Sequence, residues 1–244
     1  MPNISLRLIY TLYKQYAYEM PFLVSSPVAV IVDLVRSRQI ASRAEAQPLI
    51  EDTFGFVNGR VNPVQPIRAT IGDEFQGVFS TLGDALEATL LTRLALPSGL
   101  DCRFGIGSGA IETVGEGMAG RLQDGPGWWL AREAINEAHT REKLRNPTLR
   151  SWFRAATDEG GASGARLEPA YESVVNAYLL TRDHLISTMN DRARRVTLGT
   201  ALGRSQSELA ADEKVSQSAI SQAMRNSGGS SLLSSLDALK GGAL

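Results

Sequence analysis

The chain is organised around residues 67–79, which read Ile67-Arg68-Ala69-Thr70-Ile71-Gly72-Asp73-Glu74-Phe75-Gln76-Gly77-Val78-Phe79. Apolar or small residues occupy every second position on both sides of a Gly-Asp pair, a spacing typical of a β-hairpin. Two adjacent carboxylates, Asp73 and Glu74, stand at the predicted tip. An ordinary turn without a function explains the same pattern, and that alternative stays open at this point.

A second stretch, residues 28–35, bears on these carboxylates. Its apolar run is typical of a buried strand and contains one charged residue, Asp33. A carboxylate at the end of a buried strand is costly unless it is paired or bound to a metal. The purely structural interpretation pairs Asp33 with Arg36 or Arg38.

The elements between these strands complete a recognisable order. Helices are expected over residues 42–60, where Pro48 predicts a kink or an early end, and over 80–96. Another strand is expected over 101–111, where glycines predict close approach by a backbone or a ligand. The order is β-α-β-β-α-β, the split ferredoxin-like arrangement, so the expected class is α+β.

In that arrangement the first strand lies beside the hairpin. We therefore expect Asp33, Asp73 and Glu74 to meet at one edge of the sheet. Clustered carboxylates suit Mg²⁺, which prefers oxygen ligands and substrate phosphates.

Composition excludes several classes of protein. The 244 residues form one large domain or two small ones, and a net charge of −1 argues against general polyanion binding. A single cysteine, Cys102, excludes an internal disulfide framework and a Cys-rich zinc site. His139 and His184 are predicted on helix surfaces. No signal peptide or membrane-length apolar run is present, so we expect a cytoplasmic protein with no membrane partner.

The C-terminal region predicts a helix-turn-helix. Ser205 and Glu208 form a capping box that opens a short helix, Val215 and Ser216 make the turn, and residues 217–225 follow as the recognition helix. Six basic and four acidic residues over 191–225 give a net charge of +2, which is mild for DNA binding and favours a homodimer. A helical hairpin used for packing is the alternative. The residues expected at DNA are Arg204, Gln217, Ser218, Ser221, Gln222 and Arg225.

The connecting segments set the predicted boundaries. Residues 140–168 predict a surface loop, a long helix starts at Glu168, and the Ser- and Gly-rich residues 227–234 predict a flexible break. An amphipathic helix is expected over 4–18. The expected units are a helical segment at 1–26, a palm-like domain at 27–155, a loop and connector helix at 156–190, and an all-α helix-turn-helix domain at 191–244.

The strand end Asp33-Leu34-Val35-Arg36-Ser37-Arg38, the hairpin Gly72-Asp73-Glu74-Phe75-Gln76-Gly77 and the C-terminal helices together resemble the SatD family. The same core is similar to the palm of class III and GGDEF-type nucleotide cyclases. That similarity implies a nucleotide with Mg²⁺, held chiefly by Asp33 and Asp73 with Glu74 accessory. The residues expected around the nucleotide are Arg36, Arg38, Gly72, Gln76 and Arg132.

Departures from the cyclase pattern bear on catalysis. Ile67, Ala131 and Ile135 stand where class III enzymes have a purine-selecting lysine, an asparagine and an arginine, and Arg132 lies at a different angle on its helix. Ile71 replaces the first glycine of the GGDEF pattern. We therefore expect metal binding but little or no purine cyclisation.

Trp128 and Trp129 are adjacent, so they point to different faces of a helix. One is expected in the core, and the other is either structural or available to stack a base.

The combined prediction is a DNA-binding transcriptional regulator whose palm-like domain binds a nucleotide and Mg²⁺. A nucleotide cyclase or another phosphoryl-transfer enzyme, targeted by its helix-turn-helix, is the alternative. A scaffold whose palm only dimerises is the third interpretation.

Overall fold

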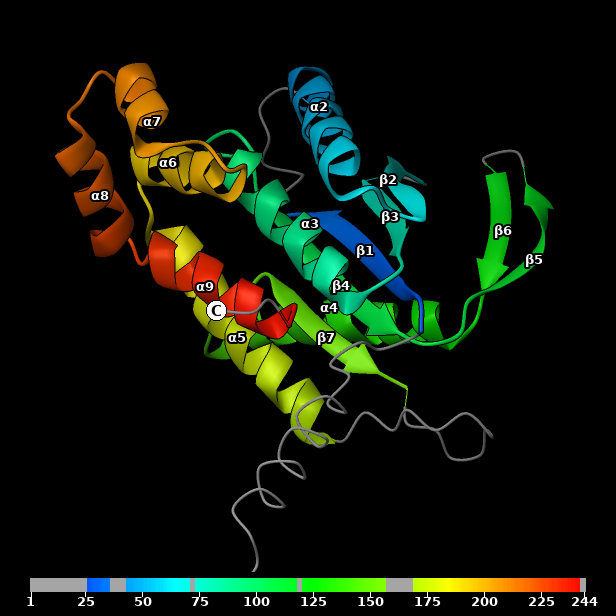
Figure 1. Ribbon diagram of the computed structural model, residues 1–244. Coiled ribbons are helices and arrows are strands. Elements are labelled where there is room, and N and C mark those ends of the chain that lie inside the picture. The colour runs from blue at the N-terminus through cyan, green and yellow to red at the C-terminus, as the bar shows by residue number, and fades with distance from the viewer. Residues whose placement is uncertain (1–25, 36–42, 71–72, 118–119, 157–168, 242–244) are drawn as a thin grey trace, which may run out of the picture.

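The computed structural model describes residues 26–35, 43–70, 73–117, 120–156 and 169–241 of the chain (Figure 1). The fold is α+β, as predicted, with one five-stranded sheet and helices on both of its faces. The helix predicted over residues 4–18 lies outside the described residues.

The main sheet has the order β2-β3-β1-β4-β7. Neighbours among the first four strands are antiparallel, whereas β7 runs parallel to β4. The first strand is therefore central and lies beside the hairpin, as the sequence predicted. The strands are β1 (Val28–Leu34), β2 (Gln65–Ala69), β3 (Glu74–Phe79), β4 (Cys102–Ser108) and β7 (Ser151–Ala155).

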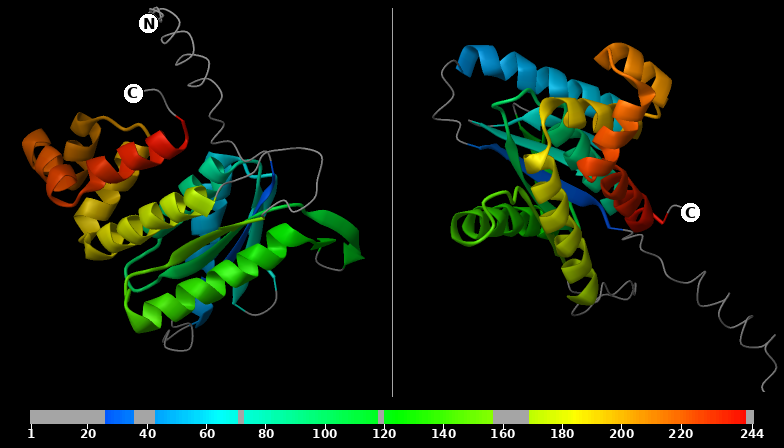
Figure 2. Two further views of the ribbon diagram at one scale, coloured as in Figure 1. Left: turned by 90° about the horizontal axis from the view of Figure 1, so that it is seen from below. Right: turned by 90° about the vertical axis from the view of Figure 1, so that its left-hand side faces the viewer.

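Helices lie on both faces of the main sheet. The right-hand view of Figure 2 places α2 and α4 on opposite sides of the sheet. Two further strands, β5 (Glu112–Gly117) and β6 (Gly120–Asp124), form a separate hairpin at one end of the molecule (Figure 1). The helices are α2 (Arg43–Val61), α3 (Leu82–Ala95), α4 (Pro126–Leu144), α5 (Pro169–Thr188), α6 (Asp191–Ala201), α7 (Gln206–Glu213), α8 (Gln217–Asn226) and α9 (Gly229–Leu239).

Glycines in β4 let α4 lie directly on the sheet. A Cβ at Gly107 would stand 2.3 Å from the backbone nitrogen of Ala131, and one at Gly105 would stand 2.1 Å from the Ala131 carbonyl oxygen. No side chain fits in that space, so the close approach expected of this strand is made by a helix backbone. α4 covers β4, β7 and β1 and leaves the β2 and β3 part of that face open.

One asparagine serves each edge strand of the main sheet. Asn58 of α2 accepts from the Ile67 backbone N–H at 2.8 Å and donates to the Ile67 carbonyl at 3.0 Å. Asn176 of α5 does the same for Phe153, at 2.8 and 2.9 Å. Each amide thus replaces one residue of a missing neighbouring strand, because it presents a donor and an acceptor together.

A buried ionic network holds α5 against the sheet and α3. The side chains of Arg182 and Asp183 are fully buried and lie 3.0 Å apart. Asp183 also pairs with Arg93 of α3 at 3.1 Å and accepts from the backbone N–H of Arg150 at 2.7 Å. Asp101 pairs with Arg93 at 3.2 Å and with Arg150 at 2.6 Å, which continues the network to the start of β4.

Three predictions about connections are wrong. β7 lies inside the loop predicted over 140–168, because a short edge strand forms only where β4 is there to pair with it. The break predicted over 227–234 is instead the start of α9, whose Leu232 and Leu236 are buried in the main core. The early end predicted at Pro48 is wrong, because α2 continues to Val61, whereas the kink given as the alternative stays a prediction.

Candidate functional site

The strand register brings the predicted carboxylates to one edge. Asp33 lies directly opposite Glu74 on β3 and opposite Arg103 on β4. Asp73 immediately precedes β3 and is close enough to Asp33 to raise the pKa of that carboxyl. Gln76 lies two residues after Glu74 on β3. Its side chain therefore points to the same face of the sheet as that of Glu74, because side chains alternate along a strand.

Arginines pair with two of these carboxylates. Asp33 Oδ2 lies 3.1 Å from Arg103, whose guanidinium also forms an ion pair with Glu142 of α4. Glu74 receives two hydrogen bonds from Arg132, at 2.6 and 2.8 Å, and its Oε1 also accepts from Gln76.

Arg103 is the partner that sequence reasoning missed. The available signal was a lone charge within an otherwise apolar and glycine-rich strand. Arg36, Arg38 and Gly72 lie outside the described residues.

The surroundings of Asp33 at this edge make its ionisation less favourable than in water. Partial burial raises the pKa of this carboxyl, and the charges of Asp73 and Glu74 add to the shift. Arg103 and His139 oppose it without cancelling it. A cation bound beside Asp33 would relieve this repulsion.

The fit of the edge to a metal ion depends on Arg132. No group of three or more His, Cys, Asp or Glu side chains positioned to hold a metal is found among the described residues. Glu74 is instead neutralised by the guanidinium of Arg132. The carboxylate oxygens are the kind that Mg²⁺ prefers, but Glu74 becomes a ligand only if its ion pair with Arg132 opens.

A hollow of about 930 Å³ adjoins this edge on the open part of the sheet face. Its walls come from β1, β2, β3, β6 and the first turns of α4. Gln76 and Arg132, both predicted near a nucleotide, line it together with Arg68 of β2. Arg68 is exposed and has no carboxylate partner within the described part of the chain. The hollow is thus lined by two guanidinium groups and by the side-chain amides of Gln65, Gln76 and Gln123.

The adjacent tryptophans divide as expected. Trp128 is half-buried and packs against the cluster of Ala29, Ile31, Ala131 and Ile135. Trp129 is 58% exposed, lines the hollow, and donates its indole N–H to Asp124 at 2.7 Å. An exposed ring held in one orientation is suited to stacking on a planar ligand.

The C-terminal helices α6, α7 and α8 pack around their own small core, which includes Val196, Leu209 and Ile220. The predicted capping box is present at the start of α7, where Ser205 and Glu208 bond each other reciprocally. A left-handed residue, Lys214, then turns the chain, and the Ser216 side chain caps α8 by accepting from a backbone N–H. The predicted helix at 217–225 is confirmed within one residue.

The polar residues predicted on this helix share one surface. Gln217, Ser218, Gln222 and Arg225 are exposed, whereas Ser221 is half-buried and accepts from Arg225 at 2.8 Å. Arg204 precedes α7 and forms an ion pair with Asp212 at 2.6 Å. Lys214, which sequence reasoning passed over, is exposed in the turn beside α8.

Two remaining predictions concern histidines and membranes. His139 of α4 and His184 of α5 are exposed on their helices, as expected. None of the helices in the described part of the chain has the length and apolar character needed to cross a membrane.

Comparison with known proteins places the chain in a family. No curated protein matches it. The model of the SatD family matches residues 27–234, which include the carboxylate edge, the hollow and the helices from α2 to most of α9. The protein therefore belongs to the SatD family.

Proposed function

We propose that this protein is a DNA-binding transcriptional regulator whose sheet domain is palm-like and binds a nucleotide. The observation that carries the proposal is the α6–α8 unit. Its last helix exposes Gln217, Ser218, Gln222 and Arg225 along one surface, next to a tight turn. A second helix with polar residues at its N-terminal end is how helix-turn-helix proteins contact base edges.

The charges around α8 make the proposed DNA contact weak in a single copy. Arg195 and Arg204 are neutralised by ion pairs with Glu213 and Asp212. Lys214 and Arg225 form no ion pair with a carboxylate among the described residues, so they are the cations best placed for phosphates. A homodimer would double these contacts and read two half-sites about 10 base pairs apart, or a multiple of that. The affinity should fall steeply with salt, because each neutralised phosphate releases a counterion.

The test is selection of bound fragments from genomic DNA, followed by gel-shift titration of the enriched site. Gln217→Ala should relax sequence preference, whereas Arg225→Ala should weaken binding to all sequences alike. Arg60→Ala changes an exposed arginine of α2, outside this surface, and should have no effect. If no site is enriched at low salt, with or without nucleotide, the DNA-binding proposal fails.

The nucleotide half of the proposal rests on the hollow beside the carboxylate edge. Trp129 offers a face to a base, and Arg68 and Arg132 offer charge to phosphates. Asp33, Asp73 and Glu74 would hold Mg²⁺, which supplies charge neutralisation at phosphate oxygens when bound. A thermal-shift screen of nucleotides, with and without Mg²⁺, tests this half, because a ligand of the folded state raises Tm.

The enzyme alternative keeps one supporting observation, which is that Asp33 and Glu74 are direct neighbours on adjoining strands. Against it, Ile67 and Ala131 are buried in apolar clusters and do not line the hollow. These positions therefore offer no polar group to a purine. Incubation with ATP or GTP and Mg²⁺ or Mn²⁺, analysed by mass spectrometry, decides the matter. Formation of a cyclic mononucleotide or dinucleotide would favour the enzyme.

A further inference from the structure

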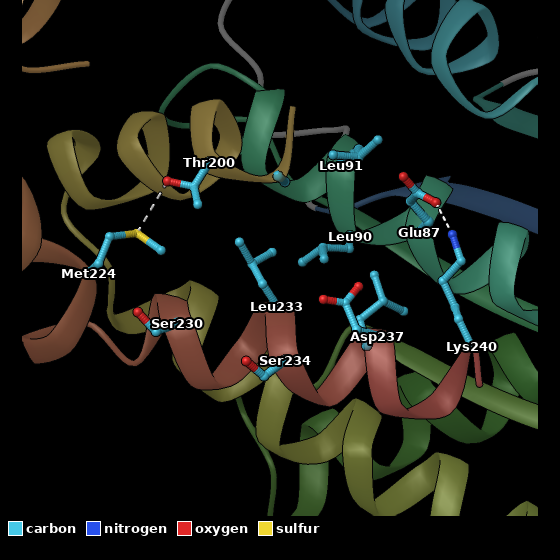
Figure 3. A pocket seen from close by; sticks show the side chains of 12 residues that line it. Glu87, Leu90, Leu91, Thr200, Met224, Ser230, Leu233, Ser234, Asp237 and Lys240 are labelled. Atoms are coloured by element: carbon cyan, nitrogen blue, oxygen red, sulfur yellow. Dashed lines mark hydrogen bonds and ion pairs between the residues drawn. The ribbon is translucent and has the colours of Figure 1, made fainter. Parts of the chain in front are cut away.

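A second hollow lies between the sheet domain and the C-terminal helices (Figure 3). Its volume is about 390 Å³, and its lining comes from α3, α6, α8 and α9, with residues 200 and 201 at the end of α6. It is separated from the carboxylate edge, because α3 lies on the opposite face of the sheet from α4. We refer to it as the α3–α9 hollow.

Six of the twelve residues that line this space are apolar, and the polar ones include the hydroxyls of Thr200, Ser230 and Ser234. Leu90 and Leu91 of α3 face Leu233 of α9, and Met224 of α8 lines one end (Figure 3). The Met224 sulfur is held there by the hydroxyls of Thr197 and Thr200, at 3.6 and 3.8 Å. An apolar ligand group would therefore meet leucine side chains and a polarisable thioether.

The α3–α9 hollow is lined by two carboxylates and one ammonium group. Glu87 and Lys240 pair with each other at one end, which neutralises both. Asp237 points toward Leu233 and Leu90 in Figure 3, and it has no hydrogen bond or ion pair among the residues that the structure describes. The hollow thus carries one carboxylate that forms no ion pair with a cation in the described ranges of the chain.

We propose that the α3–α9 hollow binds a small molecule with an apolar body and one ammonium group. The apolar body would replace water against the leucines, and the ammonium would form a charge-assisted hydrogen bond with Asp237. A carboxylate ligand of the same shape would be repelled. The volume is within the range of small-molecule sites, at its lower end, which restricts the ligand to a compact amine.

The position of the α3–α9 hollow gives such a ligand a regulatory consequence. The ligand would contact α3 of the sheet domain and, through Met224, the C-terminal part of α8. It would stabilise whichever relative placement of these helices it binds more tightly. This consequence rests on the proposed DNA-binding function, whereas binding of the amine does not.

The test uses the full chain and three matched probes: phenethylamine, hydrocinnamate and phenylethanol. Phenethylamine should raise Tm in a saturable way, and the acid should not. Asp237→Asn should weaken phenethylamine binding by up to about fivefold, because solvent screens an ion pair at an exposed carboxylate. Asp237 is exposed and makes no contact that the fold needs, so this variant should remain folded. Asp52→Asn, an exposed carboxylate on α2, is the matched control and should bind as the wild type does.

Two further measurements locate the site. Ala201→Leu, which fills the hollow, should abolish binding. In a spectrum of isotope-labelled methionine methyl groups, phenethylamine should shift the Met224 signal and leave Met189 in place. Equal responses to amine, acid and alcohol, an unchanged affinity in Asp237→Asn, or no response at all would each overturn the proposal. If the amine binds as expected but leaves DNA affinity unchanged, the binding site stands and only its regulatory consequence fails.

Discussion

The ion pair between Glu74 and Arg132 makes a specific prediction about ligand binding. In the protein without ligand, both oxygens of Glu74 are occupied by the guanidinium that we propose for phosphate. An anionic ligand must break this pair, and in doing so it releases Glu74 to bind a cation. Nucleotide and Mg²⁺ should therefore bind with positive cooperativity, each strengthening the other.

Glu74→Gln separates the two effects. The side chains of Arg132 and Glu74 are 49% and 23% exposed, so solvent screens the pair and its worth is at most about 1 kcal/mol. Removing the carboxylate frees Arg132 and takes one negative charge from the site. Nucleotide binding without Mg²⁺ should strengthen by up to about fivefold, the change in Kd that about 1 kcal/mol produces. The gain that Mg²⁺ gives the wild type should shrink, because the variant has lost one oxygen ligand.

Isothermal titration calorimetry of ATP and GTP, with Mg²⁺ or with a chelator, measures both quantities. Glu51→Gln removes an exposed carboxylate from α2 and serves as the control. If Glu74→Gln binds the metal-free nucleotide no better than the wild type, the ion pair does not restrain Arg132. If the wild type binds no nucleotide at all, the nucleotide site itself is wrong, so the two failures are distinguishable.

Three further predictions concern stability. Because the pKa of Asp33 is raised in the folded protein, its ionisation opposes folding; Asp33→Asn should stabilise the protein near neutral pH, and the gain should vanish as pH falls below the ordinary pKa of 3.8. Urea unfolding midpoints of variant and wild type, measured near neutral pH and again below the ordinary pKa of Asp33, test this. A variant less stable than the wild type at neutral pH would contradict it. Gly107→Ala should cost about 1–3 kcal/mol by overpacking against α4, whereas Gly115→Ala, with open space around its Cβ, should cost well under that, as denaturant titration will show. Asp183→Asn should cost about 3–5 kcal/mol in the same assay, because it leaves buried Arg93 and Arg182 short of a counterion; a cost below about 1 kcal/mol would refute this account.

The elements that are specified by short stretches of neighbouring residues were predicted correctly from the sequence. The hairpin around Asp73 and the run at 28–34 are specified by alternation and by continuous burial, which are visible in the sequence. The start of α7 was equally visible, since Ser205 and Glu208 satisfy the first backbone donors of that helix without help from elsewhere.

The elements that were missed depend on distant partners. β7 is a strand only because β4 lies beside it and Asn176 bonds to its outer edge. The Ser- and Gly-rich start of α9 has weak helix propensity, and burial of Leu232 and Leu236 overrides that weakness. Arg103 could be placed opposite Asp33 only once the strand register was known. In each case the deciding interaction joins residues far apart in the chain.

The asparagines at the sheet edges bear on how two copies of this chain can associate. Asn58 and Asn176 each occupy the backbone groups that an incoming strand would need at Ile67 and Phe153. A partner strand would have to displace an amide that already matches its hydrogen-bonding geometry, so joining edges into one continuous sheet gains little. A homodimer of this protein should instead assemble through helices or through the open face of the sheet, and its sheets should remain five-stranded units.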